Sequence, residues 1–346
     1  MPNILWICSD QQRFDTLGVT GNQVIRTPNL DRLAGSGTVF RRAYSQAPIC
    51  TPSRASFLTG MYPSTVHACT NGNDRWSEAA PLVTAMLRDA GYDCGLAGKL
   101  HLAGAQGRVE PRPRDDGYRF FSWSHHPIDD WEEGHDYADW VRAHGVDPTE
   151  IYKEKGFFPT EIHQTTWCTD EAIRFIDETR DGPWLMSINY FDPHPAFDPP
   201  QDYLDRYDPA EMPGPHYVES DLAAQAELSG VDFQSEPRKP EEFDAAAKQA
   251  AYYAMIELID DNVGRLLDHL EKTGRLDDTV IIYTSDHGES LGDHGLLLKG
   301  CRFYEGLVHV PLIISGPGFV SGQQTDELVE LTDIAPSLLE LAGVSV

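Results

Sequence analysis

Short apolar runs recur along the chain and predict β-strands that are buried on both faces. The runs lack the alternation of polar and apolar residues that a strand with one solvent-exposed face shows. They are NILWICS (3–9), YDCGLAG (92–98), WLMSINY (184–190), TVIIYTS (279–285) and PLIIS (311–315). Stretches with helical periodicity lie between them, near residues 28–35, 52–59, 80–90 and 166–179 and within 242–272. The alternation predicts an α/β fold in which helices cover both faces of a mostly parallel central sheet.

Two long segments interrupt this alternation. Residues 104–165 are rich in Gly, Pro, His, Trp and acidic residues, and residues 192–241 are rich in Pro and Asp. Long irregular segments in a compact domain usually carry function. Ligands of parallel sheets bind beyond the carboxyl ends of the strands. We therefore expect both segments to be loop insertions over the carboxyl-terminal edge of the sheet.

Net charge and composition restrict the possible partners and the compartment. The 346 residues carry a formal charge of −28, which argues against nucleic acid and anionic membranes as partners. No run approaches the roughly 18 apolar residues of a membrane span, and the first residues lack the features of a signal peptide. Six cysteines are scattered without paired spacing, as is typical of reduced thiols. We expect a cytoplasmic protein, and no pattern indicates its oligomeric state.

Polar side chains follow two of the predicted strands at the point where each strand ends. Asp10 and Gln11 come after the first strand, and Asp286 and His287 come after the strand at 279–285. Strand ends of a parallel sheet meet at one edge, so these side chains can converge. Two carboxylates, one amide oxygen and one imidazole are suitable ligands for a divalent cation. The sequence therefore predicts a metal site.

Cationic and imidazole side chains accompany this predicted metal site. They are Arg54, Lys99, Lys299, His101 and His194. His101 and His194 each lie in a loop that follows a strand, whereas we interpret the remaining histidines of interest as structural: His67, His125, His126 and His294. A site with a metal and fixed cations would suit a tetrahedral anion. The two titratable imidazoles could act there as a general acid and a general base.

The stretch QAPICTPSRASFLTG (46–60) places a cysteine at the start of a predicted helix. Pro52 suits a first helical turn, and Gly60 suits the position after the last turn. A helix N-terminus favours an anion, as does Arg54, which lies four residues after Cys50. The sequence therefore predicts an anion site at Cys50.

These motifs together resemble the sulfatase family of the alkaline phosphatase superfamily. CTPSR (50–54) matches the family's C-x-P-x-R signature, and the other motifs follow in family order: SDQQR (9–13), PNLDRLA (28–34), GKLH (98–101), DPHPAF (192–197) and SDHGESLGDHGLLLKG (285–300). The resemblance runs from residue 3 to the end of the chain. It implies one catalytic domain over residues 1–346, with the family's small C-terminal subdomain absent or truncated.

The resemblance also implies a reaction. A maturation enzyme would oxidise Cys50 to formylglycine, whose aldehyde hydrates to a gem-diol. One hydroxyl would attack the sulfur of a small sulfate monoester and expel the alcohol, and the second would lose its proton so that sulfate leaves. A thiol, with a pKa of about 8.5, could not release sulfate in this way.

Residue roles follow from the same resemblance. Metal ligands would be Asp10, Gln11, Asp286, His287 and the modified Cys50. Calcium is the first choice of ion, with Mn²⁺, Mg²⁺ and Zn²⁺ as alternatives because an imidazole is a softer ligand than calcium prefers. Arg54 would steady the gem-diol, and Lys99 and Lys299 would hold the sulfate oxygens. His101 would take the proton from the diol, and His194, together with Lys299, would protonate the leaving oxygen.

Two features depart from the sulfatase pattern. Most sulfatases have two aspartates where this chain has Asp10 and Gln11, and Asn71 lies 21 residues past Cys50. Both features resemble the phosphonate monoester hydrolases of the same superfamily, which also cleave phosphodiesters, so Asn71 is a possible further site residue. GKLH favours the sulfatases, because those hydrolases replace its lysine and histidine. Sulfatase is the preferred interpretation, phosphonate monoester hydrolase the alternative, and a non-catalytic metal-binding scaffold a third hypothesis.

The acidic and aromatic stretch SHHPIDDWEEGHDYADW (124–140) has two interpretations. It could form a wall for a cationic leaving group such as a choline-like alcohol. Because the whole chain is acidic, we interpret it as an exposed acidic loop.

Overall fold

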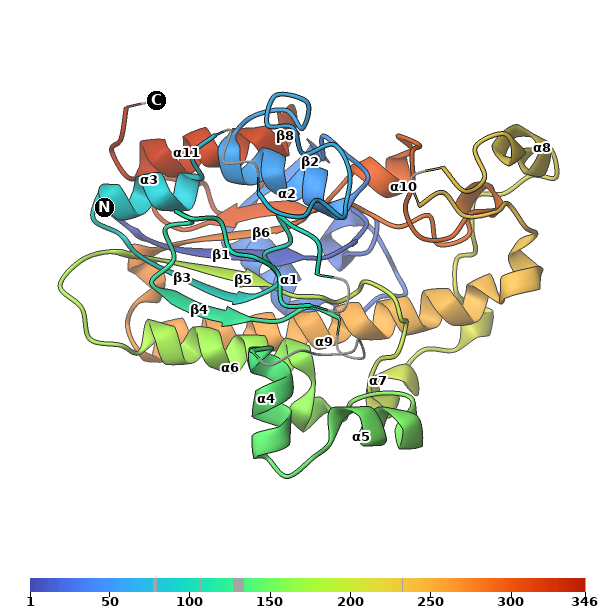
Figure 1. Ribbon diagram of the computed structural model, residues 1–346, viewed down its shortest axis with the longest axis horizontal. Helices are drawn as coiled ribbons and strands as arrows, with labels where there is room; N and C mark the ends of the chain where they lie inside the picture. The colour runs from blue at the N-terminus through green and yellow to red at the C-terminus, as the bar shows by residue number, and fades with distance from the viewer. Residues whose placement is uncertain (77–79, 106–107, 127–133, 232, 346) are drawn as a thin grey trace.

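An eight-stranded sheet forms the centre of the molecule (Figure 1). The computed structural model describes residues 1–346 except 77–79, 106–107, 127–133, 232 and 346. The strands are β1 (Asn3–Ser9), β2 (Gly37–Tyr44), β3 (Asp93–Gly98), β4 (Phe120–Trp123), β5 (Trp184–Asn189), β6 (Thr279–Ser285), β7 (Leu312–Ser315) and β8 (Gln323–Glu330). Their order is β4-β3-β5-β1-β6-β7-β2-β8, and only β7 runs antiparallel to its neighbours, β6 and β2. The mostly parallel sheet predicted from the sequence is confirmed.

Three strands were not predicted from the apolar runs. β4 and β8 are the two edge strands, and β2 lies beside β8. β8 has the sequence QQTDELVE and is mostly exposed, so it has no continuous apolar run to mark it. β2 begins with three buried residues but continues through two exposed arginines, Arg41 and Arg42. Edge positions admit polar side chains because only part of the strand is covered.

Helices cover both faces of the sheet, as Figure 1 shows. One layer contains α1 (Pro28–Gly35), α6 (Gln164–Ile176) and α9 (Ala245–Lys272), and the other contains α2 (Cys50–Thr59), α3 (Val83–Asp89) and α11 (Ile334–Leu341). Side chains of β1 point alternately toward the two helix layers: Leu5 and Ile7 pack with the first, and Ile4 and Trp6 pack with the second. This double burial explains why β1 reads as a continuous apolar run. Among the described residues, no helix has both the length and the apolar character needed to cross a bilayer.

Residues 104–165 contain regular elements, although their composition showed little periodicity. They contain the edge strand β4 and two helices, α4 (Asp136–Ala143) and α5 (Pro148–Lys155). Tyr137 and Val141 of α4 are buried in the core with α6 and α9, and Asp147 caps α5 by accepting from the backbone N–H groups of Thr149 and Glu150. Residues 127–133, which belong to the acidic stretch at 124–140, lie outside the described residues.

Residues 192–241 are largely irregular, as expected from their composition. Their regular elements are α7 (Gln201–Leu204), α8 (Asp221–Ala226) and the 3₁₀ helix η3 (Pro209–Glu211). The remaining elements are α10 (Glu305–Val308), η1 (Gly18–Thr20), η2 (Thr160–Ile162), η4 (Pro240–Phe243), η5 (Leu276–Asp278), η6 (Asp293–Gly295) and η7 (Leu331–Asp333).

Adjacent parallel strands bring distant parts of the chain to one edge of the sheet. β3, β5, β1 and β6 are neighbours, so the residues that follow them lie side by side. Gly98 ends β3 with φ +107°, and a Cβ atom there would lie 2.0 Å from the carbonyl oxygen of Asn189. Only glycine fits this crossing, after which Lys99 donates its backbone N–H to the same oxygen at 3.0 Å. The strand crossing therefore fixes where Lys99 leaves the sheet.

Candidate active site

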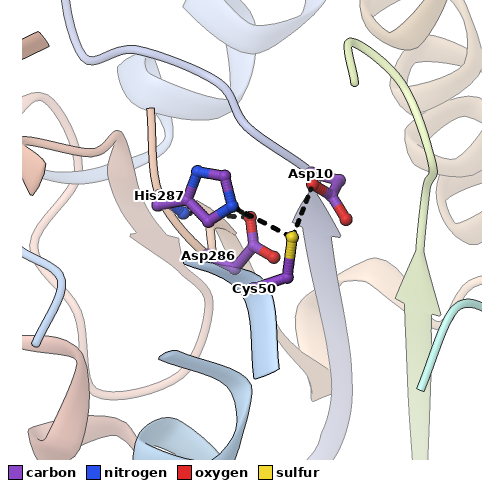
Figure 2. Close-up of side chains that lie close together, drawn as sticks. All are labelled: Asp10, Cys50, Asp286 and His287. Atoms are coloured by element: carbon purple, nitrogen blue, oxygen red, sulfur yellow. Dashed lines mark hydrogen bonds and ion pairs between the residues drawn. The ribbon is translucent and has the colours of Figure 1, made fainter. Parts of the chain in front are cut away.

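Four side chains that come from three parts of the chain meet in a buried cluster (Figure 2). Asp10 follows β1, Asp286 and His287 follow β6, and Cys50 is the first residue of α2. One potential ligand atom from each lies within 4.8 Å of the others, and all four residues are buried. Cys50 Sγ lies 3.1 Å from His287 Nε2 and 3.6 Å from Asp10 Oδ1. The cluster joins most of the predicted metal ligands.

The orientations of these side chains fit a divalent cation. His287 Nδ1 lies 2.8 Å from the carbonyl oxygen of Gly288, which can only accept, so Nε2 carries the lone pair that faces Cys50. Asp286 Oδ1 accepts from the backbone N–H groups of Gln11 (3.0 Å) and His287 (2.9 Å). Burial opposes protonation of His287, but Asp286 and Cys50 raise its pKa above the usual value.

Two lysines surround the sulfur of Cys50. Lys299 Nζ lies 2.9 Å and Lys99 Nζ 3.7 Å from Sγ, and Lys99 Nζ also lies 2.5 Å from Asp10 Oδ2. Burial and the charge of Asp10 oppose ionisation of the thiol, but Lys299, Lys99 and His287 lower the pKa of Cys50 to about 7. The position of the sulfur is therefore electropositive and suits an anion.

Arg54 joins the carboxylates of the cluster to the end of β3. Its Nε donates to Asp286 Oδ2 at 2.9 Å, its Nη2 to Asp10 Oδ2 at 3.2 Å, and its Nη1 to the carbonyl oxygen of Lys99 at 2.9 Å. The guanidinium is 1% exposed. Arg54 therefore holds both carboxylates in place from the first turns of α2.

Both predicted catalytic histidines line a pocket beside the cluster. The pocket has a volume of about 630 Å³. Burial, followed by the charge of Lys99, holds the pKa of His101 well below its usual value, and His101 Nδ1 has no hydrogen-bond partner among the described residues. His194 Nδ1 donates to the carbonyl oxygen of Pro195 at 2.7 Å, and burial and Lys299 lower its pKa as well. Both imidazoles are therefore neutral at neutral pH.

The pocket also contains residues that the sequence analysis missed or interpreted differently. His125 and His126, interpreted above as structural, line it, together with Phe191, Phe233 and Leu298. His125 and His126 come shortly after β4, the short strand that carried no recognisable apolar run. Phe191 lies two residues after the end of β5, and this position near a strand end was the available signal for it. His67 and His294 are not among the described residues that line the pocket.

Asn71 and Gln11 also line the pocket. Asn71 Oδ1 accepts from the backbone N–H of Thr51 at 2.8 Å, so Asn71 is tied to the first turn of α2. Gln11 has φ +73° and accepts from Lys299 Nζ through Oε1 at 2.8 Å. Every residue predicted for the site therefore lies in the buried cluster, beside it, or in the wall of the pocket.

Comparison with known proteins gives one family. Residues 2–344 match the family described as Sulfatase. The chain is 33% identical over 371 residues to an arylsulfatase of Clostridium perfringens, covering 100% of this chain and 76% of that protein. It is 31% identical over 359 residues to a choline-sulfatase of Rhizobium meliloti, covering 99% and 68%.

A solved structure agrees with the sequence relatives. The phosphonate monoester hydrolase of Agrobacterium radiobacter superposes with a TM-score of 0.83 at 28% identity, covering 100% of this chain and 74% of that one. The fold is therefore that of the alkaline phosphatase superfamily. The family match over residues 2–344 identifies the family within that superfamily. The chain belongs to the sulfatase family, and the protein is a sulfuric ester hydrolase.

Proposed function

We propose that the protein hydrolyses a small sulfate monoester by means of a formylglycine formed from Cys50 and a divalent metal ion, releasing an alcohol and sulfate. One observation carries the proposal. Cys50 Sγ lies at the centre of the buried cluster, 3.1 Å from His287 Nε2 and 2.9 Å from Lys299 Nζ. A nucleophile at that position would be next to both the metal ligands and the cations that receive the ester.

The metal would be held by Asp10, Gln11, Asp286, His287 and the modified residue 50. Carboxylate and amide oxygens favour Ca²⁺, and the imidazole leaves Mn²⁺, Mg²⁺ and Zn²⁺ as alternatives. When bound, the ion supplies positive charge that favours a deprotonated hydroxyl on residue 50 and offsets charge on the ester oxygens.

Formylglycine supplies a hydrated aldehyde, with one hydroxyl to attack sulfur and another whose proton loss lets sulfate depart. Lys99 and Lys299 flank position 50 at distances that suit hydrogen bonds to the sulfate oxygens. Arg54 holds Asp10 and Asp286, and thereby the geometry around position 50.

Proton transfer falls to the two neutral histidines and to Lys299. His101, whose pKa is lowered by burial, can accept the proton of the second hydroxyl at neutral pH. His194 has Nδ1 engaged with Pro195, so Nε2 is the atom that exchanges a proton. A bound anionic ester would raise the pKa of His194, and His194 and Lys299 would then protonate the leaving oxygen.

The pocket wall favours an apolar leaving group. Phe191, Phe233 and Leu298 line it, and Phe233 and Leu298 are 45% and 38% exposed. Aromatic and apolar surfaces of this kind suit the ring of a small aromatic alcohol. The similarity to an arylsulfatase supports the same substrate class.

We further propose that a formylglycine-generating enzyme matures the protein and that the mature protein acts in the cytoplasm.

Phosphonate monoester hydrolysis is the second candidate. It is favoured by the Asp10–Gln11 pair, by Asn71, which accepts from the backbone N–H of Thr51 in α2, and by the likeness to the Agrobacterium radiobacter hydrolase. Lys99 and His101, which both line the pocket, favour sulfate, because they belong to the GKLH motif that resembles the sulfatases. A sulfate monoester and a phosphonate monoester each carry one negative charge, so positioning and proton transfer decide between them.

Two measurements test the proposal. We expect a higher kcat/KM for 4-nitrophenyl sulfate than for 4-nitrophenyl phenylphosphonate, with detectable turnover of the latter. A better phosphonate substrate would establish the second candidate, and no turnover by a modified, metal-loaded protein would favour the non-catalytic scaffold. Mass spectrometry of the tryptic peptide 43–54 should show formylglycine, and Cys50→Ala should abolish turnover with the fold intact. An unmodified thiol in an active preparation would overturn the proposal.

A further inference from the structure

Glu289 is a fully buried carboxylate that lies beside the proposed metal site without being one of its ligands. It is 0% exposed and lies two residues after His287. Its Oε2 accepts from Gln11 Nε2, and its Oε1 accepts from the backbone N–H groups of Leu291 (3.1 Å) and Leu298. A single buried side chain therefore joins the end of β1 to the segment that leads to Lys299.

The amide of Gln11 has one orientation that satisfies both of its neighbours. The ammonium of Lys299 can only donate, so the atom 2.8 Å from its Nζ must be the amide oxygen. The carboxylate of Glu289 accepts, so the atom that faces it must be the amide nitrogen. Both contacts therefore direct Gln11 Oε1 toward Lys299, whose Nζ lies 2.9 Å from Cys50 Sγ.

Glu289 also holds the segment between itself and Lys299. Leu291 and Leu298, the two backbone donors, have φ of +50° and +65°. Residues with a Cβ adopt this left-handed region only where their surroundings hold them in it. The carboxylate binds the N–H of each, so it supports both turns of the segment that delivers Lys299 to the site.

We propose that Glu289 is a positioning residue for the metal site: it fixes the amide of Gln11 with its oxygen toward the cluster and sets the place of Lys299. The inference rests on the proposed metal-dependent function. It also explains why residue 11 is a glutamine. A carboxylate at position 11 would meet the carboxylate of Glu289 in a buried environment, whereas an amide offers a donor to Glu289 and an acceptor to Lys299.

The variant Glu289→Gln tests the orientation of the Gln11 amide without removing the hydrogen bonds that support the backbone. The remaining Oε1 can still accept from Leu291 and Leu298, while the new amide nitrogen faces the amide nitrogen of Gln11. If the new amide at position 289 turned over, its nitrogen would face the backbone N–H groups of Leu291 and Leu298, which are also donors. The amide of Gln11 is therefore the one that turns, and its nitrogen then faces the cluster. We expect the dissociation constant for metal to rise by about tenfold or more, as loss of a partner that orients a ligand typically causes.

The double variant Gln11→Glu/Glu289→Gln should restore binding. In it the amide nitrogen at position 289 donates to the carboxylate at position 11, whose other oxygen again faces Lys299. Glu257→Gln is the matched control, because Glu257 is a buried glutamate of α9 (6% exposed) that pairs with Arg206 rather than with Gln11. Metal affinity should be unchanged in this control.

The measurement is calorimetric titration of the metal-stripped full chain with Ca²⁺ and, separately, Mn²⁺. Failure of the wild-type protein to bind either ion would contradict the proposed function itself. Wild-type affinity in Glu289→Gln, or failure of the double variant to regain affinity, would overturn the positioning role alone.

If Glu289→Gln does not fold, the midpoint of thermal unfolding of the metal-free variant Gln11→Glu tests the positioning role instead. It should fall, because two carboxylates meet, and adding Glu289→Gln should raise it again. A double variant whose thermal midpoint is no higher than that of Gln11→Glu would overturn the inference.

Discussion

The ammonium of Lys99 lies 2.5 Å from Asp10 Oδ2 in an ion pair whose side chains are 1% and 0% exposed. Burial disfavours the carboxylate of Asp10, but Lys99, followed by His194, Arg54 and Lys299, holds its pKa well below its usual value. A buried charge without such partners would be costly. Asp10 is therefore kept ionised at the position where a metal ligand is required. Lys99, which pairs with Asp10, also lines the pocket.

Lys99→Met tests this connection. Asp10 would keep Arg54 Nη2 at 3.2 Å, so the protein should still fold. Removing a cation that stabilises charge in the transition state should lower kcat for an aryl sulfate by about 10²–10³-fold. Steady-state kinetics on the metal-loaded variant gives the answer. Near wild-type turnover would show that Lys99 only balances the charge of Asp10.

Asp286→Asn should remove the metal. Asp286 supplies one of the two carboxylates of the cluster, and the amide keeps its shape while removing its charge. Elemental analysis should find the divalent ion lost, and full occupancy would show that the site is misplaced. Asp293→Asn is the control, because Asp293 pairs with Arg13 at 2.8 Å outside the cluster. Chelation of the wild-type protein should also lower its melting temperature, because the ion binds the folded state.

His101→Ala should slow the release of sulfate more than the first release of alcohol. We expect a burst of alcohol followed by a steady-state rate reduced by about 10²–10⁴-fold. In the wild type, burial and Lys99 keep the pKa of His101 well below 6.5, so the base is neutral at that pH and above. The wild-type rate should therefore show no loss from protonation of His101 near neutral pH. Stopped-flow kinetics across pH measures both effects, and a variant that shows no burst would contradict this role.

Asp260 should make stability depend on pH. It lies on α9 and accepts from the backbone N–H groups of Asn29 (3.1 Å) and Leu30 (2.7 Å) at the start of α1. Burial raises its pKa from 3.8 to about 7, so the folded state holds a proton that the unfolded state has lost between these values. The contribution of Asp260 to stability is thus fully present below pH 3.8 and is lost as pH rises toward about 7.

Asp260→Asn removes this titration. The unfolding free energy of the variant minus that of the wild type should therefore rise across the same pH range, by on the order of 2–4 kcal/mol. Urea unfolding of both proteins in excess chelator measures the difference. A difference that does not change with pH would show that the carboxylate of Asp260 is ionised throughout.

The sequence by itself determined the central sheet and the chemical character of the site. β1, β5 and β6 are buried on both faces, so their apolar runs are continuous and can be recognised without knowledge of their neighbours. Asp10 and Asp286 directly follow such strands, so recognising the strands was enough to place them at one edge of the sheet. Cys50 was identifiable because its motif is local, with Pro52 and Arg54 close in sequence.

Only the tertiary structure decided what depends on contacts between distant residues. β8 is a polar edge strand whose one neighbour among the described strands is β2, so nothing in its own sequence marks it. His126 is in the pocket because β4 pairs with β3, a contact that no local pattern encodes. Glu289 has a role because the fold brings Gln11, 278 residues away in sequence, to its carboxylate. Periodicity reports which faces are buried, whereas the distance between two side chains is set by strand order and packing.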